Sequence, residues 1–257
     1  MSATVLYPLR PGIWVTETAV PGFHVRGVVL VWEAKALVWD TLSRPADMEP
    51  VRPLVKGREV VVVYSHADWD HAWGTAGLPD VTDVVAHRVA AERLAREGED
   101  ELLAKRHESP GVYDDVRIVL PTVTFAEDHE IELDAGTTLQ LRSLRGHTPD
   151  SVVGLLPELG ILLAGDAVET PLPLLNEGSP VREWIAGLER WASESHVELV
   201  VPAHGEVGGR DVLRRTAGYL HNLLAGVTEP PAGGLDAFYQ DAHERNVALV
   251  REGRVEL

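Results

Sequence analysis

Apolar residues in the first part of the chain fall into short runs separated by polar turn residues, not at helical spacing. Such runs of β-branched and aromatic residues predict strands, and their close spacing predicts β-hairpins. A helix is expected at residues 46–55, weakened by Pro50 and Pro53. The predicted strands lie at residues 12–16, 26–32, 36–39 and 60–64, the last a continuous apolar run typical of a buried strand.

The rest of the chain alternates between strand-like and helix-like segments. The strand-like segments are residues 83–86, 122–141, 152–156, 161–164 and 199–201. The helix-like segments are residues 88–97, 101–106, 181–192, 210–225 and 235–250. Strands followed by helices, twice over, predict an α/β fold, a four-layered αββα sandwich with its polar motifs at strand ends. We expect one domain over residues 1–257, with C-terminal helices at about 208–251.

Composition limits what the chain can be. Its 257 residues are 45% hydrophobic and 25% charged, as in an ordinary soluble domain, and no apolar run could span a bilayer. Without cysteine there are no thiolate ligands, so any metal must be held by His, Asp and Glu. A net charge of −17 argues against nucleic acid as a partner. The first residues lack the pattern of an export signal, so a cytoplasmic location is expected.

Four potential metal ligands lie directly after the strand predicted at residues 60–64. They are His66, Asp68, Asp70 and His71, in the segment Ser65-His66-Ala67-Asp68-Trp69-Asp70-His71. In a loop at a strand end such side chains can converge on one pocket, whereas a helix would spread them around its circumference. By itself the segment could also be an exposed polar turn, because His and Asp are common in turns.

Three later residues strengthen the prediction of a metal site, and each follows a strand-like run. They are His147 in Gly-His-Thr, Asp166 in Gly-Asp and His204 in Ala-His-Gly. Strand ends can bring all three to one edge of the sheets. A glycine beside each of them allows the close backbone approach that a crowded metal cluster requires.

With these motifs the chain resembles the metallo-β-lactamase superfamily, whose pattern is H-x-H-x-D-H, then G-H-T, G-D and a late G-H or A-H-G. The resemblance covers roughly residues 12–207. It implies a hydrolase with two metals and a bridging hydroxide as nucleophile, because coordination lowers the pKa of water to about 7. Asp70 would also orient that nucleophile. The implied ligands are His66, Asp68 and His147 for the first metal and Asp70, His71 and His204 for the second, with Asp166 as the bridge.

Asp68 departs from the family pattern, which has a histidine at this position. The motif in this chain is therefore H-x-D-x-D-H. An aspartate oxygen lies as many bonds from Cβ as the nearer ring nitrogen of that histidine, so Asp68 can take the same position. Two divalent ions, three aspartates and a hydroxide sum to zero, where the usual ligands leave a charge of +1. We expect a weaker Lewis acid at the first position and better competition of Mn or Fe with Zn.

The expected function is metal-dependent hydrolysis of an ester-like bond, a thioester, a lactone or a related bond, in a small molecule. The cofactors would be two divalent metal ions, of which Zn is the main candidate. One alternative is a di-iron oxidoreductase, since flavodiiron members of the superfamily also carry a carboxylate at position 68. Only 53 residues follow His204, too few for their flavin-binding domain. The other alternative is a non-catalytic metal-binding sensor. Substrate identity and oligomeric state stay open.

Several residues near the motifs are candidates for substrate contact. Trp69 could form an aromatic wall or pack against the core, and Trp73 is expected to pack. An apolar, proline-rich loop at residues 168–180 could be a substrate-covering lid or an ordinary crossover loop. Two arginines could bind a carboxylate or phosphate or could be ordinary surface residues, and a histidine of the last helix could project over the pocket or take an exposed or capping role. These three are Arg145, Arg182 and His243.

Overall fold

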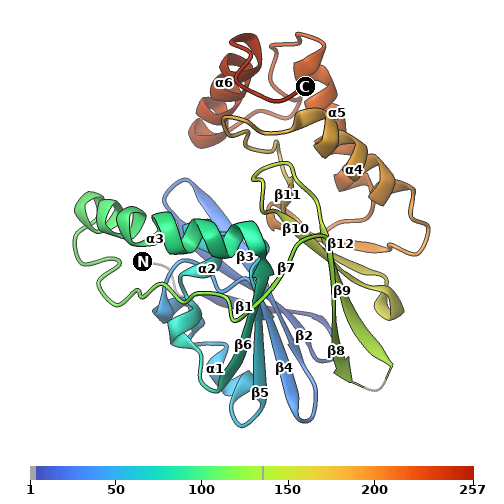
Figure 1. The fold of residues 1–257 in the computed structure, drawn as a ribbon. Coiled ribbons are helices and arrows are strands. Elements are labelled where there is room, and N and C mark those ends of the chain that lie inside the picture. The colour runs from blue at the N-terminus through green and yellow to red at the C-terminus, as the bar shows by residue number, and fades with distance from the viewer. Residues whose placement is uncertain (1–3, 135) are drawn as a thin grey trace.

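The computed structural model describes residues 4–134 and 136–257, and it contains two β-sheets packed face to face between helices (Figure 1). The strands of the first sheet follow one another in chain order, the first three pairs antiparallel and the last three parallel. They are β1 (Val5–Arg10), β2 (Ile13–Val20), β3 (Phe23–Val31), β4 (Lys35–Trp39), β5 (Glu59–Val63), β6 (Val81–His87) and β7 (Val123–Phe125).

The second sheet has the order β12-β11-β10-β9-β8. Its strands are antiparallel except for β11 and β12, which run parallel. The bounds are β8 (Asp128–Asp134), β9 (Thr137–Ser143), β10 (Val152–Leu156), β11 (Ile161–Glu169) and β12 (Leu199–His204). The predicted hairpin between residues 152–156 and 161–164 is confirmed, with Gly154 opposite Leu163.

Helices cover the outer face of each sheet (Figure 1). On the first sheet lie α1 (Arg52–Val55), α2 (Trp69–Ala72) and α3 (Arg88–Glu108), and on the second lie α4 (Val181–Ser193), α5 (Asp211–Leu224) and α6 (Ala237–Arg251). Three short 3-10 helices, η1 (Pro45–Met48), η2 (Thr75–Gly77) and η3 (Pro157–Leu159), lie in connections. The four layers are those predicted from the sequence.

The continuous apolar run of β5 is buried on both faces because the strand lies inside the sandwich. Val60 and Val62 pack outward with the residues of α3, whereas Val61 and Val63 point between the sheets. Side chains alternate across a strand, so a strand with helices on one side and a sheet on the other needs apolar residues at every position. This strand leads directly into the segment that carries four of the predicted ligands.

Two predicted helices differ in the structure. The helix expected at residues 46–55 is broken into η1 and α1, in agreement with the prolines there. The two helices expected at residues 88–97 and 101–106 are one, α3, which continues through Gly98. Gly98 packs against Ile118, and a Cβ there would lie 3.3 Å from a methyl carbon of Ile118. Strand β1 was not predicted, since its sequence contains Pro8 and it is a largely exposed edge strand.

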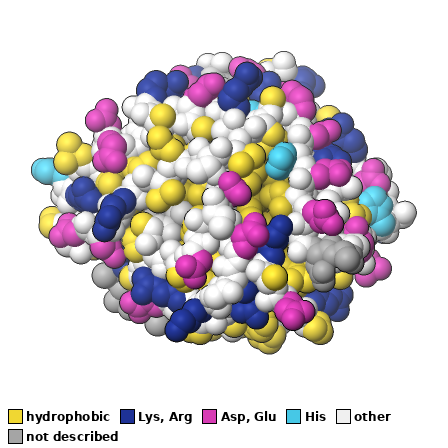
Figure 2. All heavy atoms as spheres, turned by 60° about the horizontal axis from the view of Figure 1, so that its bottom comes forward, with side chains coloured by type: hydrophobic (Ala, Val, Ile, Leu, Met, Phe, Trp, Pro, Cys, Tyr) yellow, Lys and Arg dark blue, Asp and Glu magenta, His cyan; other side chains and the backbone are white. Residues whose placement is uncertain are grey.

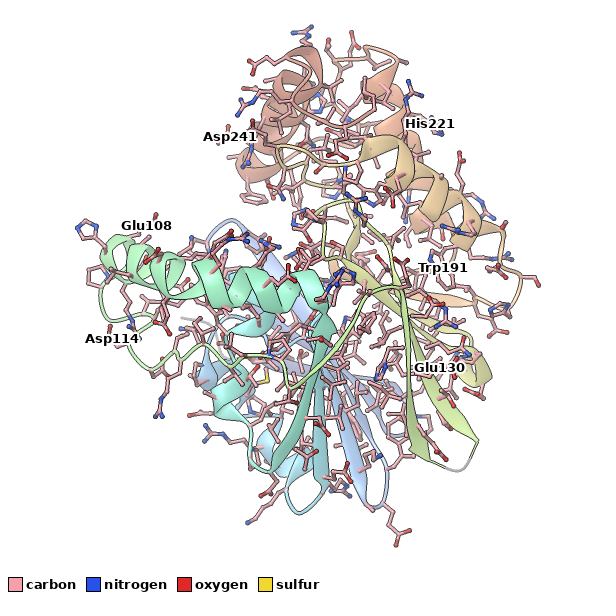
Figure 3. The ribbon with its side chains drawn as sticks, in the orientation of Figure 1. Glu108, Asp114, Glu130, Trp191, His221 and Asp241 are labelled. Atoms are coloured by element: carbon pink, nitrogen blue, oxygen red, sulfur yellow. The ribbon has the colours of Figure 1, made fainter. Side chains whose placement is uncertain are left out.

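Charged side chains of both signs are interspersed on the face shown in Figure 2, and none of its parts is uniformly basic. Glu108, His221 and Asp241 extend outward from α3, α5 and α6 in Figure 3, and all three are exposed. Within the described residues, the helices are too short or too polar for any of them to traverse a membrane. The polar residues that are buried lie mostly where the two sheets meet at one end.

Candidate metal centre

The predicted ligands come together where the ends of strands from both sheets meet. β5 leads into His66, β9 leads toward His147, Asp166 lies within β11, and His204 is the last residue of β12. The sheets touch here, because the backbone N–H of Val152 donates to the carbonyl of Ser65 over 2.9 Å. Gly165 has φ of +50° and packs so closely that a Cβ would lie 2.8 Å from Ser65 Cβ. The predicted convergence is therefore observed.

The sequence suggested that residues 65–71 form a loop, but in the structure this segment is partly helical. Asp70 and His71 lie in the single helical turn of α2, whereas His66 and Asp68 precede it. The turn is short enough that both side chains stay on the side of the cluster, and His71 is fully buried. Seven side chains, here called the histidine–aspartate cluster, meet at this point: His66, Asp68, Asp70, His71, His147, Asp166 and His204.

The first half of the cluster joins His66, Asp68 and His147. One ligand atom from each lies within 4.8 Å of the others. Asp68 Oδ2 is 3.5 Å from His66 Nε2 and 3.3 Å from His147 Nε2. Asp166 Oδ2 faces the same two nitrogens at 3.7 and 3.6 Å. Two nitrogens and two carboxylate oxygens thus surround one point.

The second half joins Asp70, His71 and His204 in the same way. Asp70 Oδ1 lies 3.7 Å from His71 Nε2, and its Oδ2 lies 3.7 Å from His204 Nε2. Asp166 Oδ1 lies 3.4 Å from His71 Nε2 and 3.3 Å from His204 Nε2. Asp166 therefore offers one oxygen to each half, the position of a bridging ligand.

Several polar atoms of this cluster are buried without a hydrogen-bond partner among the described residues. They are His66 Nε2, His71 Nε2 and Asp166 Oδ1. A buried polar atom without a partner costs about 1–3 kcal/mol, so such atoms gathered at one point need an explanation. Imidazole nitrogens and carboxylate oxygens at this spacing fit divalent metal ions, which would bind all three atoms.

In three of the four histidines, the other ring nitrogen is held by a carbonyl or carboxylate acceptor. His147 Nδ1 donates to the carbonyl of Leu174 over 2.9 Å, and His204 Nδ1 donates to that of His24 over 2.8 Å. A carbonyl only accepts, so Nδ1 carries a proton, and Nε2 is the nitrogen that can offer a lone pair to a metal once its own proton is lost. Outer partners of this kind orient metal-binding histidines and raise their basicity.

Asp40 does the same for His71 and was not singled out in the sequence. Its Oδ2 accepts from His71 Nδ1 over 2.9 Å and from Ser65 Oγ over 2.8 Å, while Ser65 Oγ lies 2.9 Å from His66 Nδ1. Asp40 is fully buried and directly follows β4. The signal that marked the ligands, a polar residue directly after a buried strand, could have found it. Arg93 and Asp150, which bind each other next to Asp68, were also missed.

Ionisation in the cluster favours charged pairs when no metal is bound. Burial opposes protonation of His204, but the carboxylate of Asp166 overcomes it and raises the pKa of His204 to about 10. Burial likewise opposes protonation of His147, but the hydrogen bond with Asp68 raises the pKa of His147 to about 9. Despite burial, the neighbouring charge of His204 holds the pKa of Asp166 well below its usual range. Protons on His147 and His204 thus supply the positive charge that bound metal ions would provide.

Metal binding is therefore expected to release protons at pH 8. In the metal-free protein His147 and His204 have pKa values of about 9 and 10 and carry protons there, whereas a metal ligand must be deprotonated. Apparent metal affinity should then rise with pH up to about 10. Calorimetric titration with Zn²⁺ in two buffers of different ionisation enthalpy measures the release. Binding without proton release at pH 8 would contradict this prediction, and the release should fall away above pH 10.

Because these two pKa values are raised, protonation of His147 and His204 stabilises the metal-free fold in a defined pH window. The folded-state pKa values of His147 and His204 lie above the unfolded value, so their contribution is fully present below about pH 6.5. It is lost as the pH rises through about 9 and 10.

A cavity of about 750 Å³ opens beside the first half of the cluster, and Asp68, Trp69, Arg93 and His147 line it. Trp69 is partly exposed, and its ring lies 6.4 Å from Phe23. Phe23 lies edge-on to His204 at 5.1 Å. Aromatic rings thus border both halves of the cluster. Trp73, by contrast, is only 1% exposed and packs in the core, as predicted.

The other substrate candidates contact different parts of the protein. Arg145 is paired with Glu183 of α4 at 3.3 Å and lines a separate cavity, and Arg182 is exposed on α4. The prediction that His243 projects over the pocket is not supported, because both its ring nitrogens are engaged elsewhere. It is 3% exposed, with Nδ1 at 2.9 Å from Tyr219 Oη and Nε2 at 3.0 Å from the carbonyl of Thr228.

The loop predicted at residues 168–180 begins only after β11, which ends at Glu169, and its remaining residues 170–180 are held at several points. Asn246 of α6 donates to the carbonyl of Pro173 over 2.7 Å and accepts from the N–H of Leu175 over 2.9 Å. Asn176 Nδ2 donates to the carbonyl of His147 over 3.0 Å. Leu175 points into the core. These contacts indicate a fixed crossover loop that orients His147, and not a lid that opens.

Sequence comparison relates the chain to one family. The family model described as "Metallo-beta-lactamase superfamily" matches residues 22–214. A protein of Bacillus cereus named metallo-beta-lactamase type 2 is 28% identical over 197 residues, covering 74% of this chain and 68% of that protein. A protein of the same name from Bacillus sp. (strain 170) is 27% identical over 198 residues, covering 74% and 67%.

Solved structures agree with this relation at the level of the fold. A metallo-beta-lactamase from Pontibacter korlensis has a TM-score of 0.67 and 22% identity, over 85% of this chain and 99% of that one. One from Erythrobacter litoralis has a TM-score of 0.65 and 18% identity, over 86% and 98%. Both likenesses support the four-layered fold. The matched region 22–214 contains all seven residues of the cluster.

Proposed function

The chain belongs to the metallo-β-lactamase superfamily, and from that premise we propose that it is a two-metal hydrolase of ester-like bonds in small molecules. The family relation supports metal-dependent hydrolysis in general. The number of metals and the type of bond are our inference. The observation that carries it is the placement of Asp166. One of its oxygens faces the two histidine nitrogens of the first half of the cluster, and the other faces the two of the second half.

Bound divalent ions, Zn in the first place and Fe or Mn as alternatives, would lower the pKa of water toward neutrality and polarise a carbonyl. The residues of the chain have separate tasks. Asp70, which is 6% exposed, would help to hold a metal and would orient the attacking water. Trp69 and Phe23 would hold an apolar part of the substrate and exclude water from the reacting carbonyl. Asp40 keeps the proton on His71 Nδ1.

An ester-like bond fits this site better than an amide. An alkoxide or thiolate can leave without the prior protonation that an amide nitrogen needs. At the first position Asp68 adds a negative charge where the family has a histidine, which weakens the Lewis acid and suits an already electrophilic carbonyl. The named relatives are β-lactamases, so β-lactams are the main competing substrate class.

Metal analysis followed by a substrate panel tests the proposal. We expect two equivalents of divalent metal per chain, and turnover of a thioester or lactone that a chelator abolishes and added Zn²⁺ restores. The panel also contains β-lactams and sulfate esters. Turnover of β-lactams alone would replace the proposed substrate class. Iron as the native metal with no hydrolysis would favour an oxidoreductase, and bound metal with no turnover would favour a sensor.

A further inference from the structure

The carboxylate of Asp68 is bound by a residue of α3 that is not itself part of the histidine–aspartate cluster. Its Oδ2 faces His66 and His147, whereas its Oδ1 accepts a hydrogen bond from Arg93 Nη2 over 2.7 Å. The two oxygens therefore point in different directions. Only Oδ2 is directed into the histidine–aspartate cluster.

Arg93 is itself held from the other side by a buried carboxylate. Its Nη1 donates to Asp150 Oδ1 over 2.5 Å, and Asp150 is fully buried. The second oxygen of Asp150 accepts from the backbone N–H of Ala67 over 2.7 Å, one residue before Asp68. The contacts close a ring that runs from Asp68 through Arg93 and Asp150 to Ala67 and back along the chain.

This ring fixes both the position and the charge of Asp68. A guanidinium is planar and presents its nitrogens in a rigid fork, so its hold on two carboxylates leaves little freedom to either. Arg93 also withdraws negative charge from Oδ1. Its side chain is only 24% exposed, and at such burial the attraction is screened less than at the surface.

We infer that Arg93 is a positioning residue that makes Asp68 a one-oxygen ligand and sets the metal affinity of the first position. The inference rests on the proposed metal site. Aspartate at position 68 and arginine at position 93 then form a matched pair. A histidine at position 68 that bound a metal through its nearer ring nitrogen would turn a ring C–H toward the guanidinium, so Arg93 would lose this acceptor and keep only Asp150.

A double-mutant cycle between these positions tests the inference. In the wild-type background Arg93→Gln is expected to lower the Zn²⁺ affinity of the first position by roughly 10–100-fold. In the Asp68→His background the same change should raise that affinity by roughly tenfold, because it removes a nearby cation that no carboxylate at position 68 neutralises. Stepwise Zn²⁺ affinities come from chelator competition, and the Co²⁺-substituted protein reports coordination through its visible absorption.

A purely structural role of Arg93 predicts a different pattern. Arg93→Gln would then lower the melting temperature of the metal-free protein and leave stepwise affinities unchanged, or lower them equally in both backgrounds, and either result overturns the inference. Arg88→Gln, an exposed residue of the same helix, is the matched control and should change nothing. If Arg93→Gln does not fold, Arg93→Lys keeps the charge without the fork and should still lose affinity. A wild-type protein with fewer than two metals contradicts the proposed function itself.

Discussion

Asp166→Asn is expected to lose the second equivalent of metal and to reduce hydrolysis by at least about 100-fold. Asparagine has the same shape, but its NH₂ group would face one pair of histidine nitrogens, and the negative charge between the two halves is lost. Both halves of the cluster depend on this side chain. Metal content after dialysis and kcat on the substrate found in the panel measure the effect.

A surface control separates this effect from a general loss of charge. Asp241→Asn makes the same chemical change at an exposed site on α6, and it should retain two metals and full activity (Figure 3). Full activity of Asp166→Asn with two bound metals would mean that Asp166 does not bridge. The two-metal hydrolase would then need a different arrangement.

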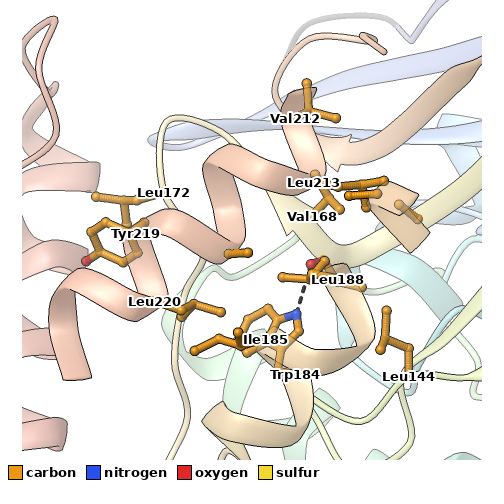
Figure 4. Packing of buried hydrophobic residues seen from close by; sticks show 14 of the residues in the cluster. Leu144, Val168, Leu172, Trp184, Ile185, Leu188, Val212, Leu213, Tyr219 and Leu220 are labelled. Atoms are coloured by element: carbon orange, nitrogen blue, oxygen red, sulfur yellow. Dashed lines mark hydrogen bonds between the residues drawn. The ribbon is translucent and has the colours of Figure 1, made fainter. Parts of the chain in front are cut away.

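Trp184→Ala is expected to lower the free energy of unfolding by about 3–5 kcal/mol. Trp184 is fully buried, and its indole N–H donates to the carbonyl of Ala167 over 2.9 Å (Figure 4). Gly146, the neighbour of His147, lies on the indole ring so closely that a Cβ would be 2.4 Å from Trp184 Cγ. The cavity would loosen the support of His147 as well. Urea unfolding of the metal-free protein measures the loss.

Two further variants show which part of the indole matters. Trp184→Phe keeps an aromatic ring but removes the N–H donor, so it should cost markedly less than the alanine variant. Trp191→Ala, in the same helix but partly exposed, should have the smaller effect of the two alanine changes. Equal losses at both tryptophans would contradict the specific support of His147 by Trp184.

Local patterns were enough to predict most of the fold. The buried strand before Ser65, the hairpin across residues 157–160 and the three C-terminal helices have the expected places. Each of them depends on a periodicity that can be recognised over a few residues. Strand β1 was missed because an exposed edge strand buries little and shows weak alternation. The break in the helix at residues 46–55 was correctly indicated by its prolines.

The seven residues of the histidine–aspartate cluster could likewise be predicted from residue types and their places at strand ends. Their partners could not, because each lies far away in the chain: Asp40 acts on His71, Leu174 on His147 and the carbonyl of His24 on His204. No local pattern specifies which carbonyl will stand next to a given ring. Packing of the two sheets decides it.

Position 68 shows the same division. The sequence by itself determined that this residue is an aspartate, which adds a negative charge to the cluster. Only the tertiary structure showed that Arg93, on the next helix, binds the outer oxygen of that carboxylate and is itself held by Asp150. Which side chain meets a charge is decided by how α3 lies against the ligand segment, because electrostatic contacts need an approach of a few ångströms that only packing provides.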